Sequence, residues 1–144
     1  TITPRQVDLA YKNAEKAGVS HLVEFRQMDY MHTEFADKTF TAVWGLESIC
    51  YAESKQDFIK EACRVLKENG RVIIGDGFAS REHYEGNDAW LMTRWMDGWL
   101  VNNLKTPEQF ARYARDAGFS ETIYRNVTQK VKKTSLIMLT RERS

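Results

Sequence analysis

The sequence has little cysteine: two thiols, Cys50 and Cys63, stand among 144 residues. Two isolated cysteines form no disulfide framework, so a reducing cytoplasm is the expected setting. The three histidines are scattered along the chain, and no cluster of His, Cys, Asp and Glu has the spacing of metal ligands. We therefore expect no metal site.

The sequence also lacks an excess of charge of either sign, because 21 basic and 20 acidic side chains nearly cancel. A surface that binds a polyanion needs clustered Lys and Arg, so nucleic acid is not an expected partner. The short basic run of Lys130, Lys132 and Lys133 is interpreted as a solvated strand end. No apolar run has the length of a membrane span, and no segment has the pattern of a signal peptide.

The middle of the chain carries the clearest secondary-structure pattern. Phe40 to Trp44 and Arg71 to Gly75 are short apolar runs, typical of buried strands. Between them, Asp57 to Lys67 places apolar residues at helical spacing. The pair Asn69-Gly70 is expected to end this helix, with Gly70 at positive φ. Two strands joined by one helix predict a right-handed βαβ crossover in a parallel sheet.

Similar patterns predict the elements around this unit. Helices are expected at residues 4–16, 88–102 and 107–117. Further strands are expected at residues 22–28, 119–131 and 135–140. The last two strands are consecutive and closely spaced, which predicts an antiparallel pair. With 42% apolar or aromatic residues, the chain is interpreted as a single domain over residues 1–144, an α/β fold with a doubly wound, mostly parallel sheet and an antiparallel C-terminal edge.

Ligands of such sheets bind beyond the carboxyl ends of the strands. Chemistry is therefore expected in Gly45 to Tyr51, after the first strand of the unit, and in Asp76 to Phe78, after the second. A glycine at position 45 could let the chain approach a ligand closely, or it could be a simple loop glycine. Asp76 is interpreted as a cap of the strand end rather than as a catalyst.

The order of several motifs along the chain is more specific than any one of them. A strand ending in Asp29 is followed by Ala36 to Trp44, by Glu47-Ser48 and by the run from Ala62 to Ile74. Two further segments fit the same order, Thr1 to Gln6 and Thr106 to Phe119. This succession resembles the Rossmann-like S-adenosylmethionine-dependent methyltransferases, and most closely small-molecule enzymes such as the tocopherol, sterol and sarcosine methyltransferases and the cyclopropane synthases. The resemblance covers nearly the whole chain.

The resemblance implies S-adenosylmethionine as cofactor and assigns several positions to its binding. These positions are Ile2, Gln6, Asp29, Tyr30, Gly45 and Leu46. Asp29 would accept a hydrogen bond from the adenine amino group, and the backbone amide of Tyr30 would lie at the adenine ring. From the residues alone, Asp29 could instead cap a turn, and Ile2 and Gln6 could be a packed and a solvated residue at a helix start.

The resemblance also implies a small-molecule acceptor with an N, O or C nucleophile. Glu47 and Tyr51 are the candidate catalytic residues that would face it. Because a sulfonium already activates its methyl group, the protein mainly aligns an in-line displacement, and a carboxylate could orient an amine or take a proton from a hydroxyl. Glu47 could also only cap the following segment. Residues 80–103, with three of the four tryptophans, would form a substrate lid, although core or dimer packing is the alternative.

The sequence departs from the family at its start. The glycine-rich loop after strand one and the acidic residue that ends strand two are not among the 144 residues, and Thr1 is not Met. We expect a fragment that lacks its first two strands and is inactive alone, with an exposed edge at residues 22–28. An alternative is a non-catalytic Rossmann-like module that is stabilised as a strand-swapped homodimer. A nicotinamide oxidoreductase has little support, because no G-x-G-x-x-G is present.

Overall fold

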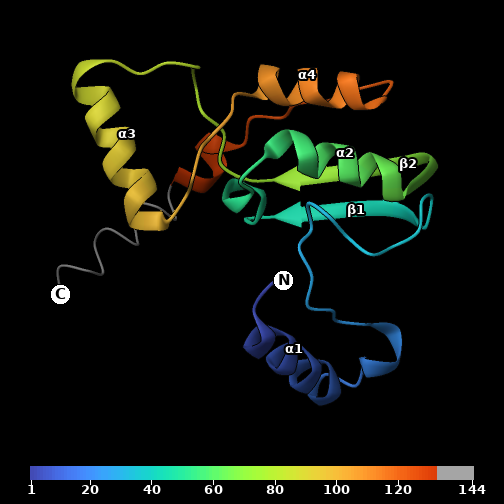
Figure 1. Cartoon of the computed structure of the whole chain (residues 1–144). Coiled ribbons are helices and arrows are strands. Elements are labelled where there is room, and N and C mark those ends of the chain that lie inside the picture. The colour runs from blue at the N-terminus through green and yellow to red at the C-terminus, as the bar shows by residue number, and fades with distance from the viewer. Residues whose placement is uncertain (133–144) are drawn as a thin grey trace, which may run out of the picture.

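A computed structural model describes residues 1–132 of the chain (Figure 1). In chain order its elements are α1 (Pro4–Lys16), η1 (Ser20–Leu22), β1 (Phe40–Leu46), η2 (Ile49–Tyr51), α2 (Lys55–Val65), β2 (Leu66–Gly75), α3 (Gly86–Trp99) and α4 (Pro107–Ala117), where η marks a short 3-10 helix. Helices and strands alternate through the middle of the chain, as the α/β prediction requires.

The strands β1 and β2 pair in parallel and α2 connects them, which confirms the predicted βαβ unit. Ala42 lies opposite Arg71, and Leu46 lies opposite Gly75. Both strands therefore end at the same edge of the sheet. Helix α2 begins earlier than predicted because the side chain of Ser54 accepts a hydrogen bond from the amide of Asp57 and caps the first turn.

The turn between α2 and the paired part of β2 differs from the prediction. Helix α2 ends at Val65, and the residue in the left-handed region is Asn69, with φ 60°, not Gly70. Asparagine tolerates this region better than most residues. Gly70 is needed for another reason, because a Cβ atom there would lie 2.8 Å from the carbonyl oxygen of Lys67. The prediction of positive φ at Gly70 is therefore wrong.

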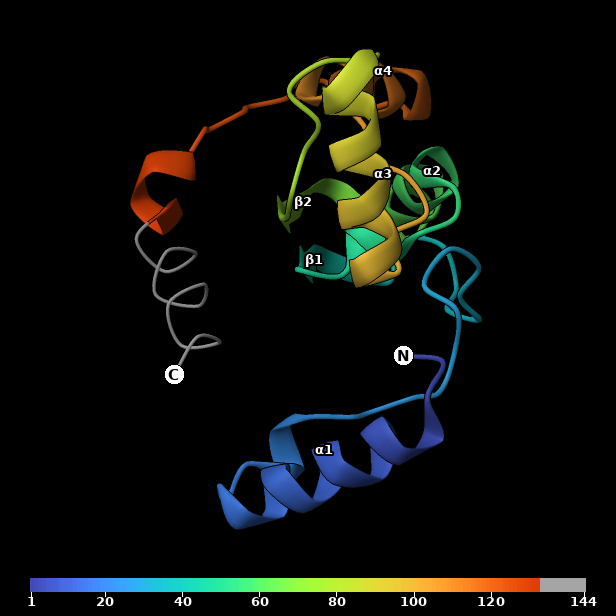
Figure 2. The same cartoon turned by 90° about the vertical axis from the view of Figure 1, so that its left-hand side faces the viewer.

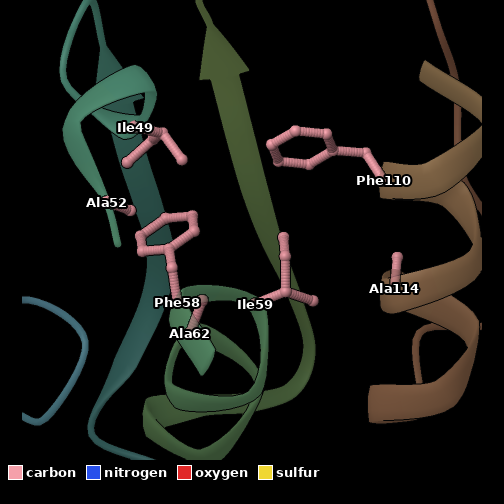
Figure 3. Packing of buried hydrophobic residues seen from close by; sticks show 7 residues of the cluster. All are labelled: Ile49, Ala52, Phe58, Ile59, Ala62, Phe110 and Ala114. Atoms are coloured by element: carbon pink, nitrogen blue, oxygen red, sulfur yellow. The ribbon is translucent and has the colours of Figure 1, made fainter. Parts of the chain in front are cut away.

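The core lies where α2 and α4 pack together over one face of the sheet (Figure 3). Its buried cluster consists of Ile49, Ala52, Phe58, Ile59, Ala62, Phe110 and Ala114. The sheet residues packed against this cluster are Val43, Val72 and Ile74. Successive residues of a strand point to opposite faces, and Trp44, Leu46 and Ile73 are 72%, 60% and 55% exposed. Within residues 1–132 the sheet thus has one packed face and one open face.

The other helices form near their predicted positions. The bounds of α1 and α4 match the prediction, and α3 starts and ends slightly earlier than predicted. Thr106 and Gln109 form a capping box at the start of α4, and Gly118, with φ 107°, ends it. Helix α1 stands apart from the sheet in both views of the chain (Figures 1 and 2). It is joined mainly to the segment after it, where the Tyr11 ring packs edge-on against Phe25.

The strand predicted at residues 22–28 does not form. Ser20–Leu22 is η1, and residues 23–29 carry no strand pairing. A strand depends on hydrogen bonds to a neighbour, and in the described part of the chain β1 pairs with β2 alone. The segment therefore has the composition of a strand without a partner to pair with.

The strand predicted at residues 119–131 is also wrong. This segment is irregular up to Val127 and helical from Thr128. Its expected antiparallel partner, residues 135–140, lies outside the described residues. An isolated strand without a partner gains no ladder hydrogen bonds, so local composition alone does not hold it extended.

Candidate functional site

At the carboxyl edge of the sheet, main-chain amides that follow β1 donate hydrogen bonds to the end of β2 and to the side chain of Asp76. The amide of Glu47 donates to the carbonyl oxygen of Gly75 at 2.8 Å. The amides of Ser48 and Cys50 both donate to Oδ2 of Asp76, at 3.1 and 2.9 Å. Asp76 is therefore a cap, as predicted, and it holds the start of η2 beside the end of β2.

Lys55 holds the other end of η2, a role that no sequence pattern predicted. Its side chain is 2% exposed, and Nζ donates to the carbonyl oxygens of Cys50 at 2.8 Å and Ala52 at 2.6 Å. Burial lowers the pKa of Lys55 from its ordinary value. A lysine at the start of an amphipathic helix is usually solvated, so no pattern distinguished it from Lys60.

Cys50 is not an activated nucleophile. Burial raises the pKa of its thiol to about 11, and the negative charge of Asp76 contributes to the same shift. A thiol with this pKa stays protonated near neutral pH, and only the thiolate is strongly nucleophilic. We therefore give Cys50 no covalent role.

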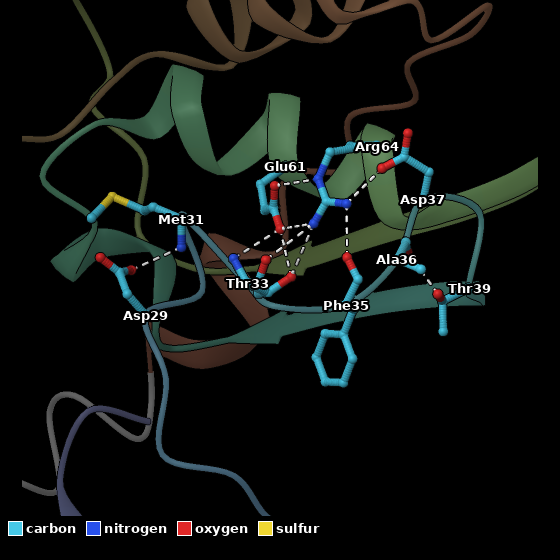
Figure 4. A network of polar contacts seen from close by, with 9 residues as sticks. All are labelled: Asp29, Met31, Thr33, Phe35, Ala36, Asp37, Thr39, Glu61 and Arg64. Carbon is cyan, nitrogen blue, oxygen red and sulfur yellow. Dashed lines mark hydrogen bonds and ion pairs between the residues drawn. The ribbon is translucent and has the colours of Figure 1, made fainter.

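The adenine-side candidates are Asp29, which caps its own turn, and Tyr30, which contacts the start of η2. Oδ1 of Asp29 accepts a hydrogen bond from the amide of Met31 at 2.8 Å, which is a turn cap (Figure 4). Within residues 1–132, Oδ2 of Asp29 accepts no hydrogen bond. The hydroxyl of Tyr30 donates to the carbonyl oxygen of Ser48 at 3.0 Å, and its ring packs edge-on against Phe58. Tyr30 therefore links the loop before β1 to the segment after it.

The candidates Ile2 and Gln6 lie beside the residues that precede Asp29. The amide of Met28 donates to the carbonyl oxygen of Thr1 at 3.0 Å, and Nε2 of Gln27 donates to that of Ile2 at 3.2 Å. The hydroxyl of Thr1 donates to Oε1 of Gln6 at 2.5 Å. The side chain of Ile2 is itself exposed. The start of the chain thus runs along the segment that leads into Asp29.

The candidates that follow β1 differ in their surroundings. Gly45 is buried, and a Cβ atom there would lie 2.7 Å from Cδ1 of Ile49, so core packing already requires a glycine. Leu46 lies on the open face of the sheet. Glu47 is exposed and has φ 47°, a left-handed conformation that is strained for a residue with a side chain. Tyr51, at the end of η2, is 46% exposed.

A polar network anchors the loop between Tyr30 and β1 to α2 (Figure 4). Arg64 donates through Nη1 to the carbonyl oxygen of Phe35 at 2.8 Å and to Asp37 at 2.6 Å, and through Nη2 to Glu61 at 2.6 Å. Glu61 also accepts from the amide of Thr33 at 2.9 Å. The hydrogen bonds from Arg64 lower the pKa of Glu61 to about 2, and those from Thr33 add to this effect.

The segment predicted as a lid, residues 80–103, begins and ends at the carboxyl edge. The amide of Ala79 donates to the carbonyl oxygen of Lys105 at 3.0 Å, which ties the two ends together after β2. Between them α3 has no buried residue, and Trp90, Trp95 and Trp99 are all exposed. The alternative that α3 packs in the core of this chain is therefore wrong within the described residues.

Two hollows in the described part of the chain have similar volumes, and neither is lined by Asp29, Gly45 or Glu47. One of about 430 Å³ is lined by Thr1, Glu24, Arg26, Met28, Tyr30, Thr33, Phe35 and Phe40. The other, of about 420 Å³, lies around the start of β2 and includes Leu66, Asn69 and Gly118. Of the candidate residues, only Tyr30 lines either hollow. Within residues 1–132, no helix has the length and apolarity to cross a bilayer, and no group of acidic, His and Cys side chains is arranged to hold a metal ion.

Comparisons with known proteins agree on one family. A family model described as a methyltransferase domain matches residues 1–74. The chain is 30% identical over 136 residues to the erythromycin 3''-O-methyltransferase of Saccharopolyspora erythraea, which covers 90% of this chain and 44% of that protein. It is 35% identical over 107 residues to the cycloartenol-C-24-methyltransferase 1 of Oryza sativa subsp. japonica, covering 72% of this chain and 30% of that protein. The chain thus spans less than half the length of these relatives.

Solved structures share the fold. A geranyl diphosphate C-methyltransferase from Streptomyces coelicolor A3(2), in complex with Mg²⁺, geranyl diphosphate and S-adenosyl-L-homocysteine, matches with a TM-score of 0.71 and 23% identity, covering 81% of this chain and 42% of that chain. The [4+2]-cyclase SpnF matches with a TM-score of 0.66 and 26% identity over 82% of this chain and 41% of its own. The same fold therefore carries more than one chemistry, and any assignment of activity must come from the site.

Proposed function

The chain belongs to the methyltransferase-domain family, and from this premise we propose that it takes part in the transfer of a methyl group from S-adenosylmethionine to an N, O or C nucleophile of a small-molecule acceptor. The observation that supports this best is the hydrogen bond from Tyr30 to Ser48 at 3.0 Å. It joins the proposed adenine side of the site to the segment that carries Glu47 and Tyr51, at the edge of the sheet where ligands bind.

The residues fit the cofactor in chemical terms on the adenine side. A carboxylate oxygen of Asp29 that accepts no hydrogen bond from residues 1–132 can accept one from an exocyclic amine. Tyr30 offers its backbone amide beside it, and Ile2 and Gln6 lie next to the approach to Asp29. Gly45 and Leu46 would border the methyl-donating end, where the cofactor supplies an activated methyl group.

Glu47 and Tyr51 are proposed to act on the acceptor. Glu47 is exposed at the carboxyl edge, so its carboxylate can orient an amine or accept a proton from a hydroxyl. Tyr51 is half exposed and can donate or accept one hydrogen bond. The acceptor is proposed to be a small molecule, as the names of the relatives suggest, since the near-zero net charge does not favour nucleic acid. A reducing cytoplasm remains the proposed setting.

These 144 residues contain neither the family's glycine-rich loop nor its acidic residue after strand two. A chain of these residues alone is therefore expected to bind the cofactor weakly and to be a poor catalyst. Calorimetric titration with S-adenosylhomocysteine measures this on two preparations, the 144-residue chain and the longest form that its gene encodes. We expect saturable binding to the longest form, and the absence of any binding to it would refute the proposed function.

The second candidate is a non-catalytic module that dimerises through exchanged strands. It is supported by the outer edge of β1 and by residues 23–29, which have no strand partner in the described chain, and by the exposed face that carries Trp44 and Ile73. Light scattering should then give the mass of a dimer at micromolar concentration. A stable monomer would remove this candidate.

A further inference from the structure

The short segment from Ser48 to Ala52, here called the η2 turn, is held from both ends by ionisable side chains that the proposed chemistry does not use. We propose that Lys55 and Asp76 are positioning residues, which together fix the η2 turn and thereby the placement of Glu47, Tyr51 and Tyr30. This inference rests on the proposed function, because it concerns the same site.

Asp76 fixes the amide end of the η2 turn. Its Oδ2 atom accepts hydrogen bonds from the amides of Ser48 and Cys50, at 3.1 and 2.9 Å. Its Oδ1 atom accepts one from the amide of Gly77 at 2.8 Å, so the carboxylate cannot rotate without losing a bond. Hydrogen bonds to a charged acceptor are about twice as strong as those between neutral groups.

Lys55 fixes the carbonyl end of the same turn. Its ammonium group donates to the carbonyl oxygens of Cys50 and Ala52 at 2.8 and 2.6 Å. The side chain is 2% exposed and forms no ion pair within residues 1–132. A buried ammonium group without a carboxylate partner is costly, because few groups replace its lost hydration. The carbonyl oxygens of Cys50 and Ala52 replace part of this hydration, so the ammonium group is held at the η2 turn by these two contacts.

The η2 turn lies between the groups that the proposed reaction needs. Glu47 directly precedes it in a left-handed conformation, φ 47°, and such strain persists only where the surroundings hold the backbone firmly. Tyr51 belongs to the turn, and the hydroxyl of Tyr30 donates a hydrogen bond to the carbonyl oxygen of Ser48, the first residue of the turn. Movement of the turn would therefore disturb the acceptor side and the adenine side together.

The direct experiment is hydrogen exchange of the amides of the η2 turn, measured by NMR on the 144-residue chain. Replacing Lys55→Met removes the ammonium group but keeps an unbranched side chain of similar length. We expect exchange at Cys50 and Ala52 to become at least about tenfold faster, the loss expected for hydrogen bonds to a charged group. Lys60→Met is the matched control, because Lys60 lies on the same helix and its side chain is 57% exposed.

Two further variants keep the inference testable if Lys55→Met fails to fold. Asp76→Asn keeps the shape of the side chain but replaces one acceptor oxygen, and should speed exchange at Ser48 and Cys50. Lys55→Arg keeps a cation that can donate to both carbonyl oxygens and should restore most of the protection. If the amides of the η2 turn exchange at rates within about twofold of those in the unaltered chain in both Lys55→Met and Asp76→Asn, the proposal is overturned.

Binding of S-adenosylhomocysteine to the longest encoded form separates this proposal from the proposed function. If the unaltered protein binds, Lys55→Met and Asp76→Asn should each weaken binding by about tenfold, and the double variant should be little weaker than either, because both act through one turn. Unchanged affinity in both variants overturns the positioning role alone. If the unaltered protein does not bind, the proposed function falls, and with it the link from the turn to catalysis.

Discussion

At the scale of single residues, Gly45 shows how a position predicted for ligand approach is also required by packing. A Cβ atom at this position would lie 2.7 Å from two atoms of the Ile49 side chain, which belongs to the core. We expect Gly45→Ala to lower the free energy of unfolding by about 1–3 kcal/mol, since the core must shift to accept the methyl group. Urea unfolding followed by circular dichroism measures the change.

The matched control for this substitution is Gly77→Ala. A Cβ atom at Gly77 would meet nothing within 4 Å, and its φ lies outside the left-handed region. This change should alter stability by less than about 0.5 kcal/mol. An equal loss in both variants would show that backbone freedom, rather than the contact with Ile49, explains the effect.

The lowered pKa of Glu61 predicts how the stability of the chain depends on pH. Its pKa is lowered from 4.5 to about 2 by hydrogen bonds from Arg64 and Thr33, so the ionised carboxylate stabilises the folded state. This stability is fully present above pH 4.5, the ordinary value, and is lost as the pH falls through about 2. Glu61→Gln should lower the free energy of unfolding by about 2 kcal/mol near neutral pH, because charged hydrogen bonds are lost.

The same variant should flatten the dependence of stability on pH below the ordinary pKa of a glutamate. Glu68→Gln is the control, since Glu68 pairs with Lys38 at the surface and its side chain is 83% exposed. Unfolding curves collected across the acidic pH range measure this dependence for the unaltered chain and for both variants. A slope in Glu61→Gln as steep as in the unaltered chain would contradict the role of the Arg64 network.

Four residues show how far sequence reasoning reaches at this scale. Asp76 was predicted as a cap because it follows a strand, and local order is enough to indicate that role. Lys55 was not identified, because its burial depends on the fold of the η2 turn over it. Asn69 and Gly70 were exchanged in role, since either residue tolerates positive φ and only the contact with Lys67 distinguishes them.

At the scale of elements, the ends of a helix can be recognised from the residues that cap it. Thr106, three residues before Gln109, fits the pattern of a capping box, which is why the start of α4 could be predicted. In the structure Thr106 is 3% exposed and forms this box with Gln109. We expect Thr106→Ala to lower the free energy of unfolding by about 1–2 kcal/mol, because an amide at the helix start loses its acceptor. Thermal unfolding measures this loss. Thr93→Ala, on the exposed surface of α3, is the control and should have little effect.

Strands depend on partners, which explains where the prediction of elements failed. The pair β1 and β2 was predicted because one connected unit contains both strands and their helix. Residues 22–28 and 119–131 have similar compositions, but no neighbouring strand pairs with them in the described chain. Composition therefore indicated where strands could form, whereas pairing decided where they do.

At the scale of the whole molecule, the order of motifs predicted the family, whereas hydrogen bonds join only some of the candidate residues to the segments around the sheet. Ile2 and Gln6 reach the approach to Asp29, and Tyr30 reaches the η2 turn. The acceptor could not be predicted, because the segment proposed to contact it, residues 80–103, exposes its tryptophans and carries no motif. The roles assigned to these residues remain predictions.

The central claim is that this edge binds the adenosine part of a methyl donor, and Asp29 tests it most directly. Calorimetric titration with S-adenosylhomocysteine should be run on the longest form that the gene encodes, with Asp29→Ala and with the control Asp116→Ala, which alters an exposed carboxylate of α4. The account predicts one site per chain, affinity at least about tenfold weaker in Asp29→Ala, and no change in Asp116→Ala. Equal affinity in all three proteins, or no binding to any, would contradict it.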